Sequence, residues 1–185
     1  MSNYSIRDVR PGDAEQLGAA HVAIWKSTYA GMIDGAKLDG LRPAHRIGRW
    51  EQIIAGIDDA SARGVRTRCA VYVPDSPIAD SPVADSHMAD SHIVGFATGG
   101  SPRDEDPPAR TELWSLNVLP EHHGTGVAND LMVDVIGHRD ASAYLWVAAA
   151  NDRAIAFYRK HRFELDGTEK FDSEWECLEA RMVRA

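Results

Sequence analysis

Two glycines between a predicted strand and a predicted helix constrain this chain more than any other feature of its sequence. The strand is predicted over Glu112–Leu119 and the helix runs to about His138, and between them stands the run His123-Gly124-Thr125-Gly126-Val127-Ala128. Backbone N–H groups at a helix start point outward without partners, and the helix dipole adds partial positive charge there. Glycines let an anion approach the main chain closely. The run therefore predicts a pyrophosphate cradle, although taken alone it also fits a plain strand–helix turn.

The common nucleotide-binding loops fit this run poorly. A Walker loop needs Gly-Lys-Ser or Gly-Lys-Thr after its glycines, and here Gly126 is followed by Val127 and Ala128. A dinucleotide-binding fingerprint comes at the first strand of its sheet, with an acidic residue about 20 positions later. The present loop follows the third or fourth predicted strand. A different phosphate-bearing ligand is therefore favoured.

Hydrophobic spacing and turn residues divide the rest of the chain into alternating elements. One helix is predicted from an Asp13 cap to about Tyr29, and a second over Pro43–Ala55, with turns at the glycines between them, namely Gly31, Gly35 and Gly40. The other expected elements are strands at Tyr4–Asp8, Arg68–Val73, His92–Thr98, Tyr144–Ala148, Phe163–Glu169 and Cys177–Val183, and a helix at Asn151–His161. The order β-α-α-β-β-β-α-β-α-β-β predicts an α/β (α+β) fold with one mixed sheet in a single domain, 1–185.

Residues 74–91 interrupt this pattern with a five-residue repeat. The segment reads DSPIA-DSPVA-DSHMA-DSHIV, with Asp at 75, 80, 85 and 90. A period of five matches neither a helix nor a strand, so we expect an exposed, expanded hairpin loop inserted in the domain. The aspartates with His87 and His92 also suggest metal ligation. A solvated loop is the favoured interpretation, because a metal site needs fixed geometry, and no metal is expected.

Charge and cysteine content exclude several classes of protein. The 20 Lys and Arg against 28 Asp and Glu give a formal net charge of -8, which argues against a nucleic-acid partner and favours a cationic substrate. Cys69 and Cys177 form no CxxC pair and are expected to be buried, reduced thiols. The sequence shows no apolar run of membrane-spanning length and no signal peptide. We therefore expect a cytoplasmic protein without membrane contact.

Two stretches together resemble the GNAT superfamily of N-acetyltransferases. Residues 112–128, ELWSLNVLPEHHGTGVA, resemble its acyl-CoA motif, whose loop is written Arg/Gln-x-x-Gly-x-Gly/Ala. Residues 151–163, NDRAIAFYRKHRF, look like its second motif, Asn-x-x-Ala-x-x-x-Tyr followed by Gly-Phe. His123 stands where the family usually has Arg or Gln, and Arg162 replaces the Gly before Phe163. The motifs keep the family's order and spacing, so the resemblance implies a central, mostly antiparallel sheet flanked by helices.

The resemblance implies acetyl-CoA as cosubstrate and a set of residues that bind it. These are the glycine run from His123 to Ala128, together with Leu116 and Val118 of the preceding strand and Asn151. Val118 would offer its backbone N–H to the thioester carbonyl. Asn151 matches the position that binds the pantetheine arm, and a helix N-cap is a second role that it can fill at the same time.

Acetyl transfer to an amine needs a base and an acid, and the resemblance provides one of each. Glu112 is the expected base, since a free alkylamine with a pKa around 10 arrives as ammonium. Tyr158 is the expected acid for the CoA sulfur, since a phenol stays protonated at neutral pH. A solvent-facing glutamate at a strand end and a core tyrosine are the structural alternatives for these two residues.

The acceptor side is less defined. Trp25 and Tyr29 share a face of the first helix, which flanks the acceptor cleft in this family, and Trp114 alternates with Glu112 on its strand. All three are expected to line the cleft, with ordinary core packing as the alternative. The predicted function is transfer of acetyl from acetyl-CoA to a primary amine of a small molecule or peptide, by direct attack in a ternary complex. A non-catalytic acyl-CoA sensor is the alternative, and a homodimer is possible for either.

Overall fold

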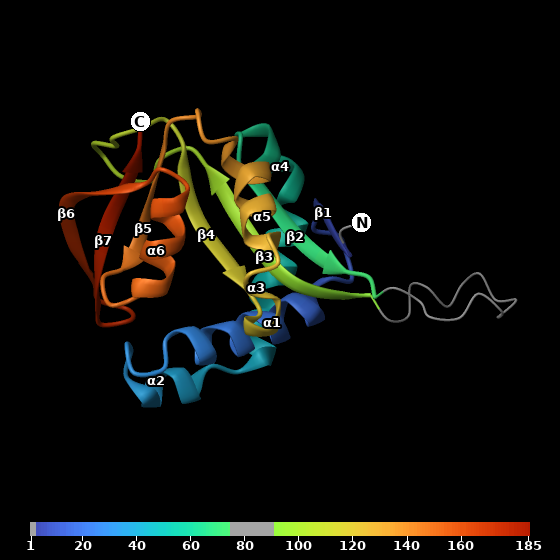
Figure 1. Ribbon diagram of the computed structural model, residues 1–185. Coiled ribbons are helices and arrows are strands. Elements are labelled where there is room, and N and C mark those ends of the chain that lie inside the picture. Colours follow the sequence, from blue (N-terminus) through green and yellow to red (C-terminus); the bar gives the residue numbers. More distant parts are fainter. Residues whose placement is uncertain (1–2, 75–90) are drawn as a thin grey trace, which may run out of the picture.

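The computed structural model describes residues 3–74 and 91–185, and these form one mixed sheet covered by helices on both faces (Figure 1). The strand order across the sheet is β1-β2-β3-β4-β5-β7-β6. The strands are β1 (Tyr4–Asp8), β2 (Arg66–Tyr72), β3 (His92–Gly100), β4 (Glu112–Val118), β5 (Ala143–Ala148), β6 (Glu164–Asp172) and β7 (Cys177–Arg184). Neighbouring strands are antiparallel except β4 and β5, which run parallel. The expected mixed, mostly antiparallel sheet is confirmed.

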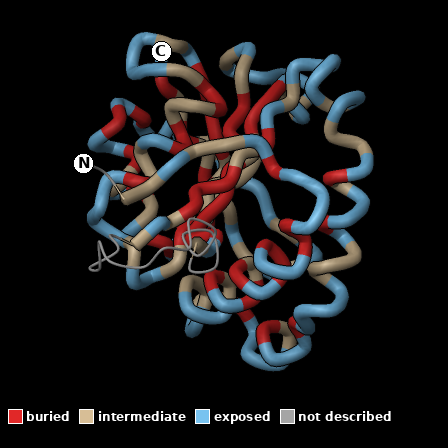
Figure 2. Tube along the Cα trace, turned by 90° about the vertical axis from the view of Figure 1, so that its right-hand side faces the viewer, coloured by how far each residue is buried: buried red, intermediate tan, exposed pale blue. Residues whose placement is uncertain are grey.

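Two groups of helices bury the two faces of this sheet. The helices are α1 (Ala14–Thr28), α2 (Gly35–Gly40), α3 (Pro43–Ala55), α4 (Ile57–Ala62), α5 (Val127–Ile136) and α6 (Asp152–Lys160). Helices α1 and α3 pack on one face through residues such as Leu17 and Trp50, and α5 and α6 pack on the other through Leu131 and Ile155. Figure 2 shows the buried segments running through the middle of the molecule, with exposed segments around them.

The packing of α3 on α1 follows from the sequence spacing. Pro43 opens α3, where its missing N–H costs no hydrogen bond, and the helix ends at Ala55 as predicted. Trp50 and Ile54 lie on its buried face. The two helices approach closely at Gly18 of α1. A Cβ at this position would lie only 2.6 Å from Ile47 Cγ1. Trp50 is therefore a core residue, as the helical spacing of Ile47, Trp50 and Ile54 along one stripe of the sequence indicates.

Three local expectations are wrong. Residues Gly35–Gly40 form a short helix, α2, rather than turns, because the Asp34 carboxylate accepts a hydrogen bond from the Ala36 N–H at 2.9 Å and starts it. Asp13 precedes α1 but does not cap it, since its carboxylate accepts bonds from the Arg7 guanidinium and the Arg10 N–H. The β6 strand continues to Asp172, where it still pairs with Cys177.

The predicted loop at 74–91 joins two paired strands. Tyr72 of β2 is opposite His92 of β3 in an antiparallel ladder. Residues 75–90, including His87, lie outside the described residues, so the loop conformation expected for them stays a prediction. Within residues 3–74 and 91–185, no helix combines the length and apolar content needed to cross a membrane. Cys69 is buried and Cys177 only partly so, and both are free thiols.

His21 of α1 makes the stability of the fold sensitive to acid. Burial lowers the pKa of His21 from 6.5 to about 4, and Arg46 adds to the effect. Both ring nitrogens are buried without a hydrogen-bond partner among the described residues, between the rings of Trp25 and Phe96. The unfolded chain thus binds a proton more readily than the folded one between these pKa values.

We therefore expect the free energy of unfolding to fall as the pH drops from about 6.5 toward 4, by up to about 3 kcal/mol from this residue alone. His21→Phe should raise the melting temperature and flatten that pH dependence, measured by thermal melts at several pH values. The exposed His45 of α3 provides the control, since His45→Phe should do neither. A steep acid dependence that survives in His21→Phe would contradict the assignment.

Candidate active site

A cleft of about 1130 Å³ opens between α1, the C-terminal strands and the start of α5 and α6. It brings together residues that lie far apart in the sequence. The predicted site residues that line it are Trp25, Tyr29, Glu112, Trp114, Leu116, Val118, His123, Gly124, Gly126, Ala128, Asn151 and Tyr158. Two others do not line it: Val127 is packed in the core at 1% exposed, and the Thr125 hydroxyl donates to the His122 carbonyl at 2.8 Å.

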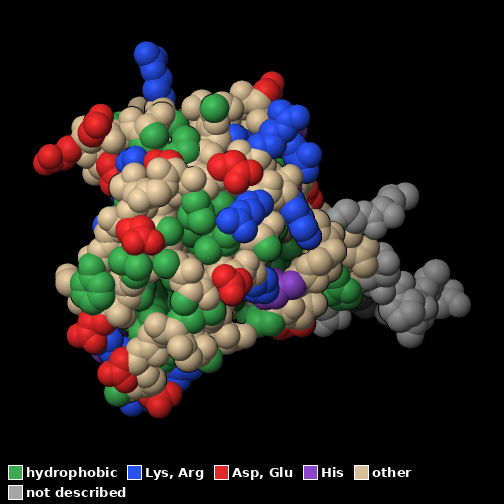
Figure 3. Space-filling model, turned by 60° about the vertical axis from the view of Figure 1, so that its left-hand side comes forward, with side chains coloured by type: hydrophobic (Ala, Val, Ile, Leu, Met, Phe, Trp, Pro, Cys, Tyr) green, Lys and Arg blue, Asp and Glu red, His purple; other side chains and the backbone are tan. Residues whose placement is uncertain are grey.

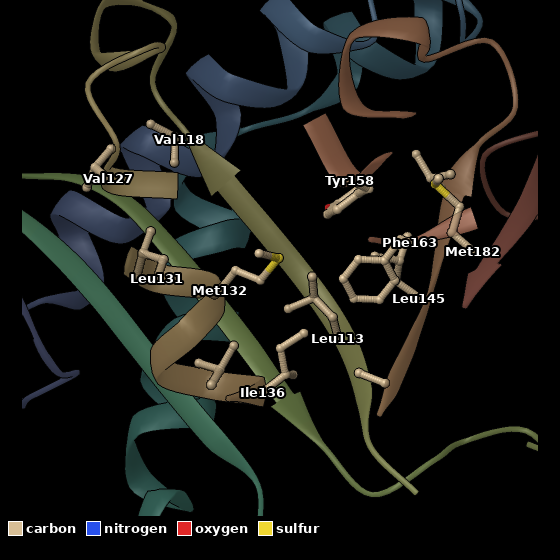
Figure 4. Close-up of a cluster of buried hydrophobic side chains, with 14 of the residues drawn as sticks. Leu113, Val118, Val127, Leu131, Met132, Ile136, Leu145, Tyr158, Phe163 and Met182 are labelled. Atoms are coloured by element: carbon tan, nitrogen blue, oxygen red, sulfur yellow. The ribbon is translucent and has the colours of Figure 1, made fainter. Parts of the chain in front are cut away.

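The floor of the cleft is a parting of two parallel strands. The ladder between β4 and β5 consists of Glu112 opposite Tyr144 and Leu113 opposite Leu145, and no further residue pairs follow. Beyond Leu113 the two strands diverge, so this edge of β4 is open from Trp114 to Val118 (Figure 1). An open strand edge offers backbone N–H and C=O groups to an extended ligand. Figure 4 shows Tyr158 near this gap, with Val118 on β4 and Leu145 on β5.

The glycine run bends the chain from β4 into α5. Gly124 and Gly126 have φ values of 80° and 94°, which L side chains rarely adopt. Gly126 is the N-cap residue of α5 and has no side chain to cap the helix. The first N–H groups of α5 are therefore accessible at the cleft, and a β-carbon at either glycine would meet no atom within 4 Å. This is the geometry of an anion cradle.

His123 is linked to a cation that the sequence analysis did not select. Its Nε2 lies 2.9 Å from the Val118 carbonyl oxygen, and Arg153 Nη1 lies 2.7 Å from its Nδ1. Burial lowers the pKa of His123 and Arg153 adds to this, while the bond to Val118 opposes it. A neutral ring fits both contacts, donating from Nε2 and accepting at Nδ1. Arg153 thus brings a positive charge next to His123, the position at which the motif that this run resembles usually has Arg or Gln.

Glu112 is fully buried and held by two partners. Arg103, in the loop before β4, donates to it from its backbone N–H at 2.8 Å and its Nε at 2.9 Å, and its Nη2 also contacts Oε1. The Tyr144 hydroxyl donates to Oε2 at 3.1 Å. Together these occupy about four acceptor positions, which is the capacity of a carboxylate. Burial, with Glu112 close by, raises the pKa of Tyr144 to about 12.

Tyr158 lies on α6 and Asn151 directly precedes this helix, and both line the cleft. Tyr158 is 8% exposed, and its hydroxyl has no hydrogen-bond partner among the described residues. Burial raises its pKa well above the usual range, and Tyr29 adds to the shift. Asn151 caps α6, since its Oδ1 accepts from the Ala154 N–H at 3.1 Å. The hydroxyl of Tyr158 is therefore protonated and available to a ligand.

Aromatic side chains gather along the cleft. Trp25 packs against Tyr29 and Trp175 at ring-centroid distances of 4.9 and 4.4 Å, and Arg103 lies over Trp114 at 5.2 Å. Four of the five tryptophans in the chain line the cleft, including Trp146, which sequence reasoning missed together with Trp175 and Glu179. Only the strand pairing brings these residues to the site. On the face shown in Figure 3, hydrophobic side chains gather between acidic and basic ones.

The comparisons with known proteins agree with this geometry. A sequence model of the acetyltransferase (GNAT) family matches residues 60–163, more than half of the chain. The chain belongs to the GNAT family. The members of this family are acyltransferases. A probable N-acetyltransferase from Mycobacterium tuberculosis is 24% identical to this GNAT chain over 167 residues, which are 90% of this chain and 83% of the relative. An uncharacterized N-acetyltransferase from Mycobacterium bovis is 40% identical over 83 residues, 43% of this chain and 51% of the relative.

Solved structures share the GNAT fold over nearly the whole chain. The PaiA N-acetyltransferase from Thermoplasma acidophilum, crystallised with coenzyme A, aligns with a TM-score of 0.63 and 18% identity, covering 96% of this chain and 97% of its own. Arabidopsis thaliana NAA60, in complex with a bisubstrate analogue, aligns with a TM-score of 0.59 and 16% identity over 98% of both chains. At these identities the likeness establishes the fold.

The Arg103–Glu112 contact should fix the loop between β3 and β4. Arg103→Gln would leave the buried Glu112 carboxylate with fewer donors, and we expect a loss of about 1–3 kcal/mol in the free energy of unfolding. Urea titration measures it. Arg110→Gln, an exposed change in the same loop, is the matched control and should have little effect. Equal stability of the two variants would show that the contact does not anchor the loop.

Proposed function

We propose that this GNAT protein transfers an acetyl group from acetyl-CoA to the primary amine of a small molecule or peptide. The observation that carries the proposal is the placement of three features in one cleft. These are the open edge of β4, the glycine run at the start of α5 and the unpartnered hydroxyl of Tyr158. The fold neighbour crystallised with coenzyme A supports the same ligand here.

The cofactor would lie along β4 and across the start of α5. Its pyrophosphate would bind the N–H groups from His123 to Ala128, where Arg153 adds positive charge. Its pantetheine arm would extend along the open edge of β4, near Leu116 and Asn151. Val118 would donate its backbone N–H to the thioester carbonyl and stabilise the oxyanion.

The amine would attack the thioester directly, within a ternary complex. The departing thiolate needs a proton, and among the described residues the Tyr158 hydroxyl is a protonated group in the cleft without a hydrogen-bond partner. Tyr29 is another such group, but only Tyr158 belongs to the second motif. The incoming ammonium must first lose a proton, and two glutamates line the cleft, the expected Glu112 and also Glu179. Because the hydrogen bonds of Glu112 are directed to Arg103 and Tyr144, its role as base would require one of them to move aside.

Gly126→Glu should abolish acetyl-CoA binding, because the added carboxylate would stand where the pyrophosphate binds. The readout is the rise in melting temperature with acetyl-CoA, which reports binding to the folded state. Gly64→Glu is the matched control, since Gly64 also has a positive φ, 80°, but lies in the turn before β2. It should keep the ligand-induced rise. A normal rise in Gly126→Glu would refute the cradle.

Tyr158→Phe should lower kcat by about 10²-fold and leave the affinity for acetyl-CoA unchanged, because the hydroxyl acts on the leaving thiolate. Turnover is followed by release of the CoA thiol, and affinity by the melting shift. Tyr72→Phe, outside the cleft, removes the same hydroxyl group elsewhere and should leave kcat as in the wild type. An undiminished kcat in Tyr158→Phe would exclude the acid role.

A further inference from the structure

In the part of the cleft formed by β5, β6 and β7, the ammonium group of a lysine lies over an aromatic ring. Lys170 of β6 holds its Nζ 3.9 Å from the centroid of the Trp146 ring and 3.6 Å from Glu179 Oε2. The Trp146 ring is fixed in turn by its Nε1–H, which donates to Asp104 Oδ2 at 2.9 Å. An indole face together with a carboxylate is a good receptor for an alkylammonium ion. All four side chains line the cleft.

Strand register places Trp146 and Glu179 on the same face of the sheet. Ala180 and Met182 of β7 are buried on the side covered by α6, so Glu179 points to the opposite side, toward the cleft. Glu179 is opposite Ala148 of β5 and opposite Lys170 of β6. The same alternation directs Trp146 to this side, because its neighbours Leu145 and Val147 belong to the α5 and α6 core.

Glu179 also lies nearer the expected reaction centre along the strands than Glu112 does. Glu112 is opposite Tyr144, and Ala148 lies four positions further along β5. Counting the same distance along β4 reaches Leu116, or its neighbour because of the irregularity near Trp114, and this is about two residues short of Val118, the proposed thioester position. Glu112 is six residues from Val118, roughly 20 Å along the strand at about 3.3 Å per residue. In the strand direction Glu179 is therefore closer to Val118 than Glu112 is.

The surroundings of Glu179 suit a proton acceptor. Its side chain is 23% exposed. Burial raises its pKa, Asp172 of β6 adds to the rise, and Lys170 and Arg103 oppose it. From its own strand and from α1 it faces Cys177 and Tyr29, both of them neutral at pH 7 because burial raises the pKa of each. A carboxylate with a raised pKa is a stronger base than an exposed one.

We propose that the ammonium group of the acceptor binds between Trp146 and Glu179, where Lys170 now lies, and that Glu179 accepts its proton. The inference rests on the proposed function and names the substrate class: an unbranched primary alkylamine, because the lysine side chain that fits this place is one. Lys170 is then an internal stand-in that moves aside when the acceptor enters, and Glu112 is a positioning residue for Arg103.

The reaction balances with the groups present. The ammonium gives one proton to Glu179, and the freed lone pair forms the C–N bond to the thioester carbon. When the C–S bond breaks, the thiolate takes the proton of Tyr158, and the second nitrogen proton restores that phenol. Glu179 releases its proton to solvent. The products are the N-alkylacetamide, CoA as the thiol and one proton.

The first experiment measures binding without turnover. The CoA complex, labelled with ¹⁵N at the tryptophan indoles, is titrated with n-pentylamine at pH 7, where it is the ammonium ion, and with n-pentanol as the uncharged control. We expect a saturable shift of the Trp146 indole signal, identified with Trp146→Phe, from the amine alone. Glu179→Gln should weaken binding about tenfold or more, and Lys170→Met should tighten it severalfold.

The matched control is Glu169→Gln, which removes the same charge from an exposed residue next to Lys170 and should bind as the wild type does. No saturable Trp146 shift, or equal affinity in Glu179→Gln and Glu169→Gln, would overturn the ammonium site. If Glu179→Gln did not fold, Lys170→Met would still test the ammonium site, because this variant is expected to bind the amine more tightly than the wild type.

The second experiment tests the role of Glu179 as the base separately from the proposed acetyl transfer. With acetyl-CoA and n-pentylamine, Glu179→Gln should lower kcat about 10²-fold and abolish the loss of rate on acidification. Wild-type kcat in this variant would overturn the base assignment while acetyl transfer stands. A wild type whose melting temperature does not respond to acetyl-CoA would instead refute the proposed function, and the indole titration, repeated on the protein without CoA, would still judge the ammonium site.

Discussion

The parting of β4 from β5 is the constraint on which the rest of this structure depends. Two residue pairs hold the strands together, Glu112 with Tyr144 and Leu113 with Leu145, and core residues of α5 and α6 pack against both strands on one face of the sheet. A parted sheet exposes backbone groups that a closed ladder would satisfy internally. The glycine run, Tyr158 and the cleft carboxylates all take their places relative to this gap.

A hydrogen-bonded carboxylate, Glu112, is buried at the closed end of the gap. Glu112 accepts hydrogen bonds from Arg103 and Tyr144 and so ties the β3–β4 loop to the place where β4 and β5 still pair. Removing two charges from water is costly unless geometry and hydrogen bonds compensate. Here the carboxylate is fully bonded, whereas Glu179, at the open end, has one ammonium beside it. The two glutamates thus have different physical roles within one cleft.

Much of the fold followed from local signals. Pro43 and the stripe of Trp50 and Ile54 predicted α3 with its observed bounds, because helix starts and apolar periodicity are encoded within a few residues. The sequence predictions were wrong where a side-chain contact, rather than the local pattern, determined the structure. Asp13 bonds Arg7 instead of capping α1, and Asp34 starts a helix where glycines suggested turns.

The sequence by itself determined the two motifs, the order of the strands and of the longer helices, and the residues proposed for the cofactor side, because each motif is contiguous and its backbone geometry is local. Most of the residues that it predicted for the site line one cleft. Only the tertiary structure brought together the residues proposed for the acceptor side. Trp146, Lys170 and Glu179 stand on three different strands and meet through the β5–β7–β6 register. No spacing pattern in the sequence predicts such a cluster, because long-range strand pairing alone brings its members together.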